Sequence, residues 1–192
     1  RVIEQANAGT VALEAVRVVA TRPVVLSDRC CIDTTSLLPP GEGLLVGDTA
    51  GAMFLVHNEN LESPYAAARP FRVNAGAVHA YVRLPGARTA YLCELGAGDE
   101  VLAADPQGRT RVVAVGRNKI ERRPMLLVRA ESADGRPVSL VLQNAETVRL
   151  TTPAGEPASV TALEPGDEVL AAFDEVVGRH FGTAVDETVQ ER

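Results

Sequence analysis

Residues 56–81 hold two of the three histidines of the chain, together with two glutamates. His57 and Glu59 are two residues apart, so they would face the same side of an extended strand. With Glu62 or His79 they would form a mixed set of nitrogen and oxygen ligands, which suits Zn²⁺, Mn²⁺ or a related divalent ion. The sequence therefore predicts a metal site at His57, Glu62 and His79. The alternative is a structural histidine beside solvated loop carboxylates.

Two arginines flank a rigid Pro-Phe pair in the sequence Arg69-Pro70-Phe71-Arg72. An arginine guanidinium can bind a carboxylate or a phosphate through two parallel hydrogen bonds. Asn74 follows two residues later and belongs to the same polar stretch. These residues predict a binding site for a small anionic substrate. Surface arginines that balance nearby acids are the alternative.

Lys119 lies in the basic segment 117–124, with arginines on both sides. A lysine beside other cationic groups can be activated as a nucleophile, so Lys119 is a candidate to form a Schiff base with a ketone. A run of this kind is also typical of a solvated strand edge that protects against aggregation. Lys119 is therefore predicted as a catalytic residue, with the solvated edge as the alternative.

Two further polar clusters could line a pocket or take part in proton transfer. Gln143, Asn144 and Glu146 follow an apolar run, and they could line the mouth of a pocket or cap a turn. Arg179 and His180 form the last polar cluster, in which His180 could act as a general acid or base. The sequence contains no phosphate-binding loop, nucleophile elbow or dinucleotide fingerprint.

The composition argues against two classes of partner. The 192 residues carry a formal net charge of −6 and have a pI near 5.1, so we expect neither nucleic acid nor anionic membrane, which both need a basic face. No apolar run approaches the ~20 residues of a membrane-spanning helix. The three cysteines lack metal-binding spacing and are expected to be reduced thiols, which predicts a cytoplasmic protein.

The elements that must position these side chains are expected to be strands. Short apolar runs alternate with Gly, Pro and Asp, and few stretches show a helical period. Turn residues at 105–108 and 133–136 predict hairpins. We expect strands over residues 10–20, 28–35, 43–46 and 52–56. The fold class is therefore mainly β, with few or no helices.

An internal repeat links two parts of the chain. The segment 95–104 (LGAGDEVLAA) returns at 163–172 (LEPGDEVLAA), 68 positions later (163 minus 95). In both copies a Gly-Asp turn leads into a strand, which indicates a duplicated β-unit in a small β-barrel or sandwich. We therefore divide the chain into residues 1–85, a strand-rich segment with the His/Glu/Arg cluster, and residues 86–192, a duplicated barrel-like unit.

Several motifs, taken in order, resemble one family. They are DRCCIDT at 28–34, MFLVH at 53–57, RPFRVNAG at 69–76, KIE at 119–121, LQNAET at 142–147 and RHFG at 179–182. The set resembles the type II 3-dehydroquinate synthases and their branch of 3-amino-4-hydroxybenzoate synthases, from about residue 10 to the end of the chain. Family members carry a further N-terminal α/β portion. The resemblance therefore implies a C-terminal half whose partner is the absent N-terminal domain.

The resemblance implies one of two reactions on a small anionic C7 substrate. A dehydroquinate synthase of this type oxidatively deaminates a 2-amino-6-keto acid with NAD and cyclises it. The aminohydroxybenzoate branch cyclises and aromatises an amino-keto acid phosphate with a divalent metal, Mn. We favour this branch for two reasons. The chain is rich in Ala, Val, Arg and Gly, as expected from a high-GC genome, where secondary metabolism is common, and its turn at 47–52 differs from the turn that we associate with dehydroquinate synthases. A non-catalytic scaffold or oligomerisation half is the third alternative.

The chemistry that the resemblance implies gives the candidate residues their expected roles. Lys119, Glu146 and His180 are expected to be catalytic. His57, Glu62 and His79 are expected to hold the metal. The remaining polar candidates are expected to bind substrate, and they are Arg69, Arg72, Asn74, Gln143, Asn144 and Arg179. We also expect a homo-oligomer.

Overall fold

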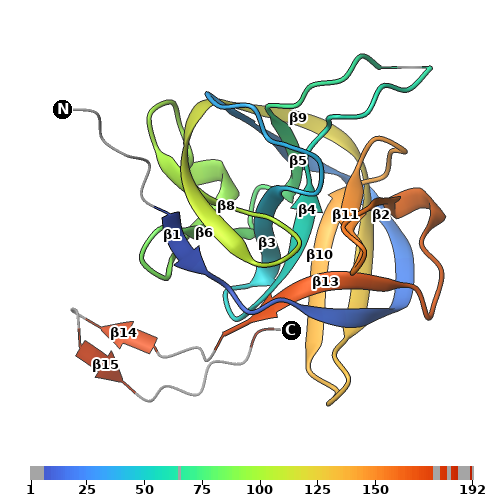
Figure 1. The fold of residues 1–192 in the computed structure, drawn as a ribbon. Coiled ribbons are helices and arrows are strands. Elements are labelled where there is room, and N and C mark those ends of the chain that lie inside the picture. Colours follow the sequence, from blue (N-terminus) through green and yellow to red (C-terminus); the bar gives the residue numbers. More distant parts are fainter. Residues whose placement is uncertain (1–6, 65, 175–177, 181–182, 186–190, 192) are drawn as a thin grey trace.

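The computed structural model describes residues 7–64, 66–174, 178–180, 183–185 and 191 (Figure 1). The strands of the first half are β1 (Asn7–Thr10), β2 (Glu14–Thr34), β3 (Gly43–Thr49), β4 (Ala52–His57), β5 (Arg72–Ala77), β6 (Tyr81–Leu84) and β7 (Arg88–Tyr91), followed by the 3-10 helix η1 (Leu92–Glu94). The second half holds β8 (Glu100–Ala104), β9 (Arg109–Glu131), β10 (Pro137–Gln143), β11 (Arg149–Thr151), β12 (Pro157–Ser159), the 3-10 helix η2 (Val160–Ala162), β13 (Glu168–Phe173), β14 (Gly178–His180) and β15 (Thr183–Val185). The predicted mainly β fold is confirmed.

Two long antiparallel strands, β2 and β9, pair with each other along most of their length and curve around the fold (Figure 1). The start of β2 pairs with β13 and its end pairs with β5. In the same way β9 pairs with β8 at its start and with β10 at its end. Because β8 pairs with β3, β3 with β4, and β4 with β13, the pairings close a ring of strands in the order β2-β9-β8-β3-β4-β13.

The order of the strands shows that the duplication extends well beyond the repeated turn. The path β12-β11-β4-β13-β2-β9-β8-β3-β6-β7 keeps its order when it is read from the other end and the corresponding strands are exchanged. The corresponding pairs are β2 and β9, β8 and β13, β3 and β4, β6 and β11, and β7 and β12. One copy is β2 with β5 to β8, and the other is β9 to β13. The β3–β4 hairpin belongs to neither copy and lies across the pseudo-two-fold axis between them.

The two repeated turns have matching geometry. Gly98 and Gly166 have φ angles of 92° and 96°, in the left-handed region that favours glycine. The carboxylates of Asp99 and Asp167 each accept a backbone N–H three residues earlier at 2.8 Å. The division that we expected at residue 85 falls between the paired strands β6 and β7, and strands from both sides of it share one sheet.

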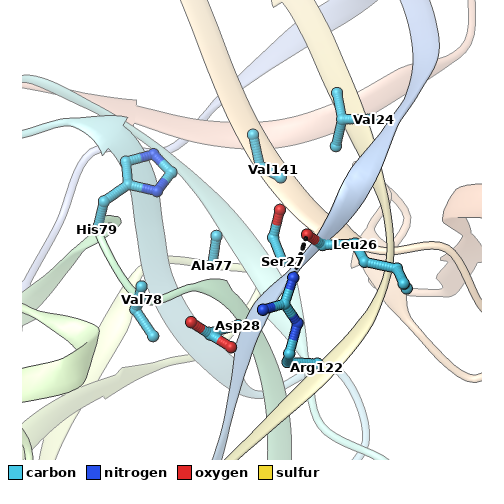
Figure 2. Close-up of a pocket in the computed structure, with 9 residues that line it drawn as sticks. All are labelled: Val24, Leu26, Ser27, Asp28, Ala77, Val78, His79, Arg122 and Val141. Atoms are coloured by element: carbon cyan, nitrogen blue, oxygen red, sulfur yellow. Dashed lines mark hydrogen bonds between the residues drawn. The ribbon is translucent and has the colours of Figure 1, made fainter.

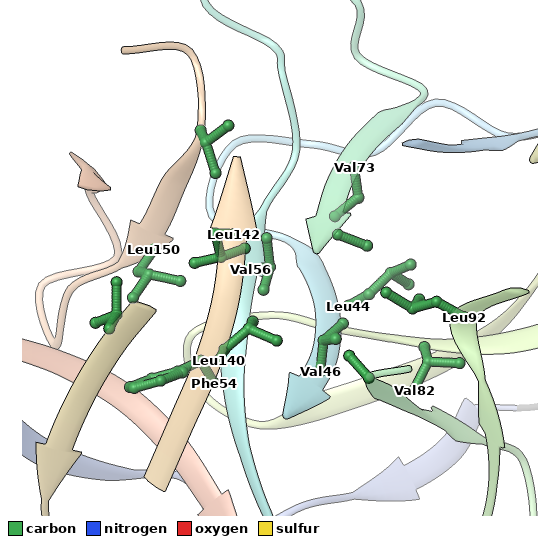
Figure 3. Packing of buried hydrophobic residues seen from close by; sticks show 14 of the residues in the cluster. Leu44, Val46, Phe54, Val56, Val73, Val82, Leu92, Leu140, Leu142 and Leu150 are labelled. Carbon is green, nitrogen blue, oxygen red and sulfur yellow. The ribbon is translucent and has the colours of Figure 1, made fainter. Parts of the chain in front are cut away.

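The inserted β3–β4 hairpin is packed on both faces, which explains the continuous apolar run of β4. Phe54 and Val56 face the main core cluster, where they lie beside Leu140 of β10 (Figure 3). Met53 and Leu55 point the other way, into a second apolar cluster. A strand buried on both sides has no need of polar alternation.

Close approach within this hairpin requires glycine. A Cβ on Gly43 would lie 1.8 Å from the carbonyl oxygen of Val56, and one on Gly47 would lie 2.0 Å from that of Ala52. No real side chain tolerates such contacts. These two glycines therefore let β3 lie flat against β4.

We expected two separate strands over residues 10–20 and 28–35, which is wrong, because β2 is one strand that continues through Pro23. A proline has no N–H to donate, so it is disfavoured in a strand that is paired with neighbours on both sides. Here β13 pairs with residues 14–17 and β5 with residues 29–33, so Pro23 lies where only β9 is beside β2. The other edge of β2 has no paired strand at Pro23, so the proline interrupts no pairing there.

In the described part of the chain, no helix has the length and apolar character needed to span a membrane.

Candidate active site

Strands β5, β2 and β9 carry polar side chains on one face and core side chains on the other. Cys30 and Ile32 of β2 point into the main core cluster. Arg29, Cys31 and Asp33 alternate with them and therefore point to the opposite face. Their cross-strand partners on β5 and β9 include Asn74 and Arg72 on one side and Lys119 and Arg117 on the other. We call the group Arg29, Cys31, Asp33, Glu59, Arg72, Asn74 and Lys119 the polar face.

Asp33 is the most strongly bound acid of the polar face. Arg72 donates to both of its carboxylate oxygens, at 2.7 and 3.0 Å, and Arg117 adds a third hydrogen bond at 2.7 Å. Burial favours the neutral carboxyl, but the hydrogen bonds from Arg72 and Arg117 outweigh it and lower the pKa of Asp33. Asp33 therefore stays ionised and fixes the guanidinium of Arg72 in one orientation.

Beside Asp33 on the polar face, the buried thiol of Cys31 lies between Asn74 and Lys119 on the neighbouring strands. Cys31 is 2% exposed, and its cross-strand partners are Asn74 on β5 and Lys119 on β9. Arg29 donates a hydrogen bond to its sulfur. Burial raises the pKa of the Cys31 thiol, so the sulfur is neutral. The side chain of Lys119 is about half exposed and forms an ion pair with Glu121 at 2.9 Å.

Two buried polar atoms of this face have no partner in the described part of the chain. Arg29 is 5% exposed, yet its Nε makes no hydrogen bond. Asn74, also 5% exposed, donates from Nδ2 to Gln143 at 2.8 Å, but its Oδ1 is unpaired. An unpaired buried polar group costs ~1–3 kcal/mol, and such groups in a native structure often bind a ligand or an ordered water.

Glu59 comes from the loop after β4 and lies against the same face. Its backbone holds it there, because its N–H donates to the backbone carbonyl of Arg72 at 2.8 Å and its own carbonyl accepts the backbone N–H of Arg69 at 2.6 Å. Glu59 is 8% exposed, and its carboxylate makes no hydrogen bond or ion pair with the described residues. Burial raises the pKa of Glu59, although Arg72, Arg69 and Arg29 act in the opposite direction.

His57 has a structural role in this fold. It is 3% exposed, its Nε2 accepts the N–H of Gly41 at 2.9 Å, and its Nδ1 lies 2.7 Å from the carbonyl oxygen of Asn58. Burial lowers the pKa of His57, so the ring is neutral. Because both ring nitrogens are bound to backbone groups, neither is available to a metal ion in this arrangement.

The other two predicted metal ligands lie elsewhere. His79 forms an ion pair with Asp48 at 2.9 Å, and Glu62 is exposed in the loop before β5. Within the described ranges, no three His, Cys, Asp or Glu side chains are grouped so that they could hold a metal ion. The structure therefore does not bring His57, Glu62 and His79 together as a ligand set. A divalent metal stays a prediction for the protein.

The remaining predicted residues are spread around this site. Arg69 is half-buried beside Glu59, whereas Asn144 and Glu146 are exposed on the turn that follows β10. Arg179 and His180 lie in β14, but their side chains fall outside what the structure describes. The polar face thus joins Arg72, Asn74 and Lys119, with Gln143 and Arg69 at its border.

Sequence reasoning missed Arg29, Cys31 and Asp33, and it considered Glu59 only as a possible metal ligand beside His57. The signal for the first three was the alternation in DRCCIDT, where polar residues at 29, 31 and 33 interrupt a buried strand. Glu59 gave no such signal, because its position depends on a loop that folds back onto β5. The grouped side chains can bind an organic anion and can offer it both a proton donor and an acceptor.

The comparison with known proteins agrees with these motifs. A family model for the 3-dehydroquinate synthase II C-terminal domain matches residues 15–192. The 3-dehydroquinate synthase of Methanopyrus kandleri is 53% identical over 100% of this chain and 48% of its own length. The 3-dehydroquinate synthase homolog of Aquifex aeolicus is 56% identical over 94% and 54%. The 3-dehydroquinate synthase of Methanoculleus marisnigri is 56% identical over 97% and 56%.

No solved structure matches the chain. The chain spans about half the length of the curated relatives that it matches. The matched model nevertheless covers every residue of the polar face. The chain therefore belongs to the 3-dehydroquinate synthase II family, in which it corresponds to the C-terminal domain.

Proposed function

We propose that this chain is the C-terminal part of an enzyme with 3-dehydroquinate synthase II activity, and that its polar face binds the substrate. The proposed reaction is the oxidative deamination and cyclisation of a C7 2-amino-6-keto acid. The unpaired, buried polar atoms of Arg29 and Asn74 beside the fixed guanidinium of Arg72 carry the proposal. A substrate carboxylate would bind the arginines, and a substrate hydroxyl would bind the amide oxygen.

Lys119 takes the role of the group that polarises the ketone. Its ammonium forms an ion pair with Glu121 at 2.9 Å, and it can donate a further hydrogen bond to a ketone oxygen. Glu59 takes the role of the base for the carbon acid, because burial raises the pKa of its carboxyl and no described donor competes for it. The Schiff base that we considered for Lys119 is the competing role.

The polar face does not fit a metal ion or a dinucleotide. Its two carboxylates lie among several arginines, and Asp33 is already bound by Arg72 and Arg117. The sequence also lacks a glycine-rich phosphate loop. We therefore derive no step through Mn or NAD in this half of the protein, and both cofactors stay predictions for the complete enzyme.

The relatives named above favour the dehydroquinate synthase reaction over the aminohydroxybenzoate branch. That branch stays the second candidate, because the turn of residues 47–52 differs from the turn that we associate with dehydroquinate synthases. One experiment separates them. The intact protein is incubated with the C7 amino-keto acid, or with its phosphate, in the presence and absence of NAD. Formation of NADH and dehydroquinate supports the proposal, and an aromatic amino acid product without NAD supports the second candidate.

Two substitutions of Lys119 test the proposed role. Lys119→Arg keeps the charge and should retain part of kcat, whereas Lys119→Met should lower kcat by about 100-fold. A Schiff base would instead be lost equally in both variants and would be trapped by borohydride in the wild type. Arg22→Met, an exposed arginine of β2 outside the polar face, is the matched control. A scaffold without catalytic function would show no effect of either Lys119 variant.

A further inference from the structure

An open pocket lies on the other side of the strands that carry the polar face. Its volume is about 480 Å³ (Figure 2). Asp28 of β2 and Arg122 of β9 line it, and they are direct cross-strand partners. Arg29 and Glu121, their neighbours along the two strands, belong to the opposite side because side chains alternate along a strand. The pocket and the polar face are therefore separate sites.

His79 enters the pocket from the turn after β5, and it is held in place by Asp48. Its Nε2 lies 2.9 Å from Oδ1 of Asp48. Asp48 is itself fixed, because Ser139 donates to its other oxygen at 3.1 Å and the N–H of Val141 donates at 3.3 Å. This leaves Nδ1 of the ring for a ligand, and in Figure 2 the nitrogen-bearing edge of His79 faces the pocket. A carboxylate that is bound this firmly orients the imidazole.

The charges of Asp28 and Arg122 in the pocket are not balanced by ion pairs with the described residues. The carboxylate of Asp28 has no hydrogen bond or ion pair with any described residue. The described contact of Arg122 is a long hydrogen bond of 3.5 Å to the carbonyl oxygen of Leu26 (Figure 2). The pocket thus presents the carboxylate of Asp28, the guanidinium of Arg122 and the imidazole of His79, beside an apolar wall that includes Val24 and Val141.

This combination selects one chemical class of ligand. Asp28 would repel a plain carboxylate or phosphate, and Arg122 would repel a plain amine or a metal cation. The hydrogen bond to Asp48 raises the pKa of His79, which favours a ring that can also donate from Nδ1. We propose that the pocket binds a small zwitterion of the α-amino-acid type, with its ammonium on Asp28, its carboxylate on Arg122 and His79, and its side chain on the apolar wall. The site lies apart from the polar face, and the proposal does not rest on the proposed reaction.

Calorimetry with three probes of one shape tests the proposal on the intact protein. L-Leucine carries both charges, 4-methylpentanoate lacks the ammonium, and 3-methylbutylamine lacks the carboxylate. L-Leucine is expected to bind saturably at millimolar concentration and at least about tenfold more tightly than either analogue, since a hydrogen bond to a charged group contributes ~1.5–3 kcal/mol.

Substitutions in the pocket should act on one charge at a time. Asp28→Asn should weaken L-leucine about tenfold but not 4-methylpentanoate, because it removes the charge that repels this carboxylate. Arg122→Gln should weaken L-leucine and 4-methylpentanoate but not 3-methylbutylamine, because it removes the charge that repels this amine. Arg22→Gln, on the same strand but outside the pocket, is the matched control and should change none. A misfolded variant would lose all three probes together.

Three results would overturn the proposal. The first is that L-leucine does not bind the wild-type protein at millimolar concentration. The second is that the singly charged analogues bind as tightly as L-leucine. The third is that Asp28→Asn and Arg122→Gln behave like the control.

Discussion

The two copies of the duplicated unit differ in the chain that joins their first two strands. In the C-terminal copy β9 turns directly into β10 through residues 132–136, and the outward-facing Arg129 and Glu131 are exposed. In the N-terminal copy residues 35–71 separate β2 from β5, and the outward-facing Arg29 and Asp33 are 5% and 3% exposed. The same sheet face is therefore open in one copy and covered in the other.

The difference teaches how a site can arise on a repeated scaffold. The inserted segment brings Glu59 against β5, close enough for its carboxylate to interact electrostatically with Arg29 and Cys31. Covering a polar face removes water from it, so every polar group there needs a partner in the protein or in a ligand. The exposed face of the other copy is under no such requirement. The covered face of the N-terminal copy therefore differs from the exposed face of the C-terminal copy because of the inserted segment, and not because the sheet itself is different.

The largest effect should come from the core of the insertion. Phe54→Ala removes a fully buried ring that packs in the main core cluster, so the free energy of unfolding should fall by about 4 kcal/mol. Urea denaturation should still show one transition, because the β3–β4 hairpin lies across both copies. Leu37→Ala, at a position 70% exposed in the same insertion, should have almost no effect. A second transition would mean that the hairpin folds separately from the duplicated unit.

The next effect should separate the covered face from the open one. Arg72→Ala leaves Asp33 buried with Arg117 as its one described cationic partner, so the free energy of unfolding should fall by about 3 kcal/mol. Arg129→Ala on the open face should change it by less than about 0.5 kcal/mol. Chemical denaturation of both variants measures the difference. Equal losses would show that coverage by the insertion does not distinguish the two faces.

A smaller effect should reveal the remaining symmetry. Asp99 and Asp167 make the same hydrogen bond in the two repeated turns, each at 2.8 Å. Asp99→Ala and Asp167→Ala should therefore each lower the free energy of unfolding by about 1 kcal/mol, and the two losses should agree. Thermal denaturation of the single variants and the double variant measures them. Clearly unequal losses would show that the repeated sequence has lost its equivalence in structure.

The sequence was a good guide to the strands and to the existence of a repeat. Apolar runs and Gly-Asp turns are local signals, and they predicted the mainly β fold that the structure confirms. The full duplication was hidden for two reasons. The β3–β4 hairpin separates β2 from β5 in the N-terminal copy, and β2 and β5 share no repeated motif with β9 and β10 of the other copy. Pairing between distant strands gives no local signal, so the ring order could not be predicted.

The candidate site was predicted in part. Arg72, Asn74 and Lys119 meet because their strands are paired through β2 in a register that only the fold defines. His57 was misleading, because a histidine after an apolar strand looks alike whether it binds metal or backbone groups. The backbone contacts of Gly41 and Asn58 decide between these roles, and they come from the fold.

The smallest effect concerns the pH dependence of the covered face. Burial raises the pKa of Glu59 in the folded chain, so the folded state binds more protons than the unfolded state above about pH 4.3. Its contribution to stability is therefore greatest below this pH and is lost as the pH rises through the folded pKa. Asp33 has the opposite sign, because Arg72 and Arg117 lower its pKa and its contribution is lost as the pH falls.

Glu59→Gln should remove the loss of stability that Glu59 causes as the pH rises, and it should keep the loss that Asp33 causes as the pH falls. Urea denaturation at about pH 4 and about pH 8 should show that the variant loses less stability on raising the pH than the wild type does, by about 1 kcal/mol or less. Glu131→Gln, at an exposed position of the open face, should follow the wild type. If Glu59→Gln also followed the wild type, the insertion would not desolvate this carboxyl. The covered and open faces would then differ in sequence but not in their electrostatics.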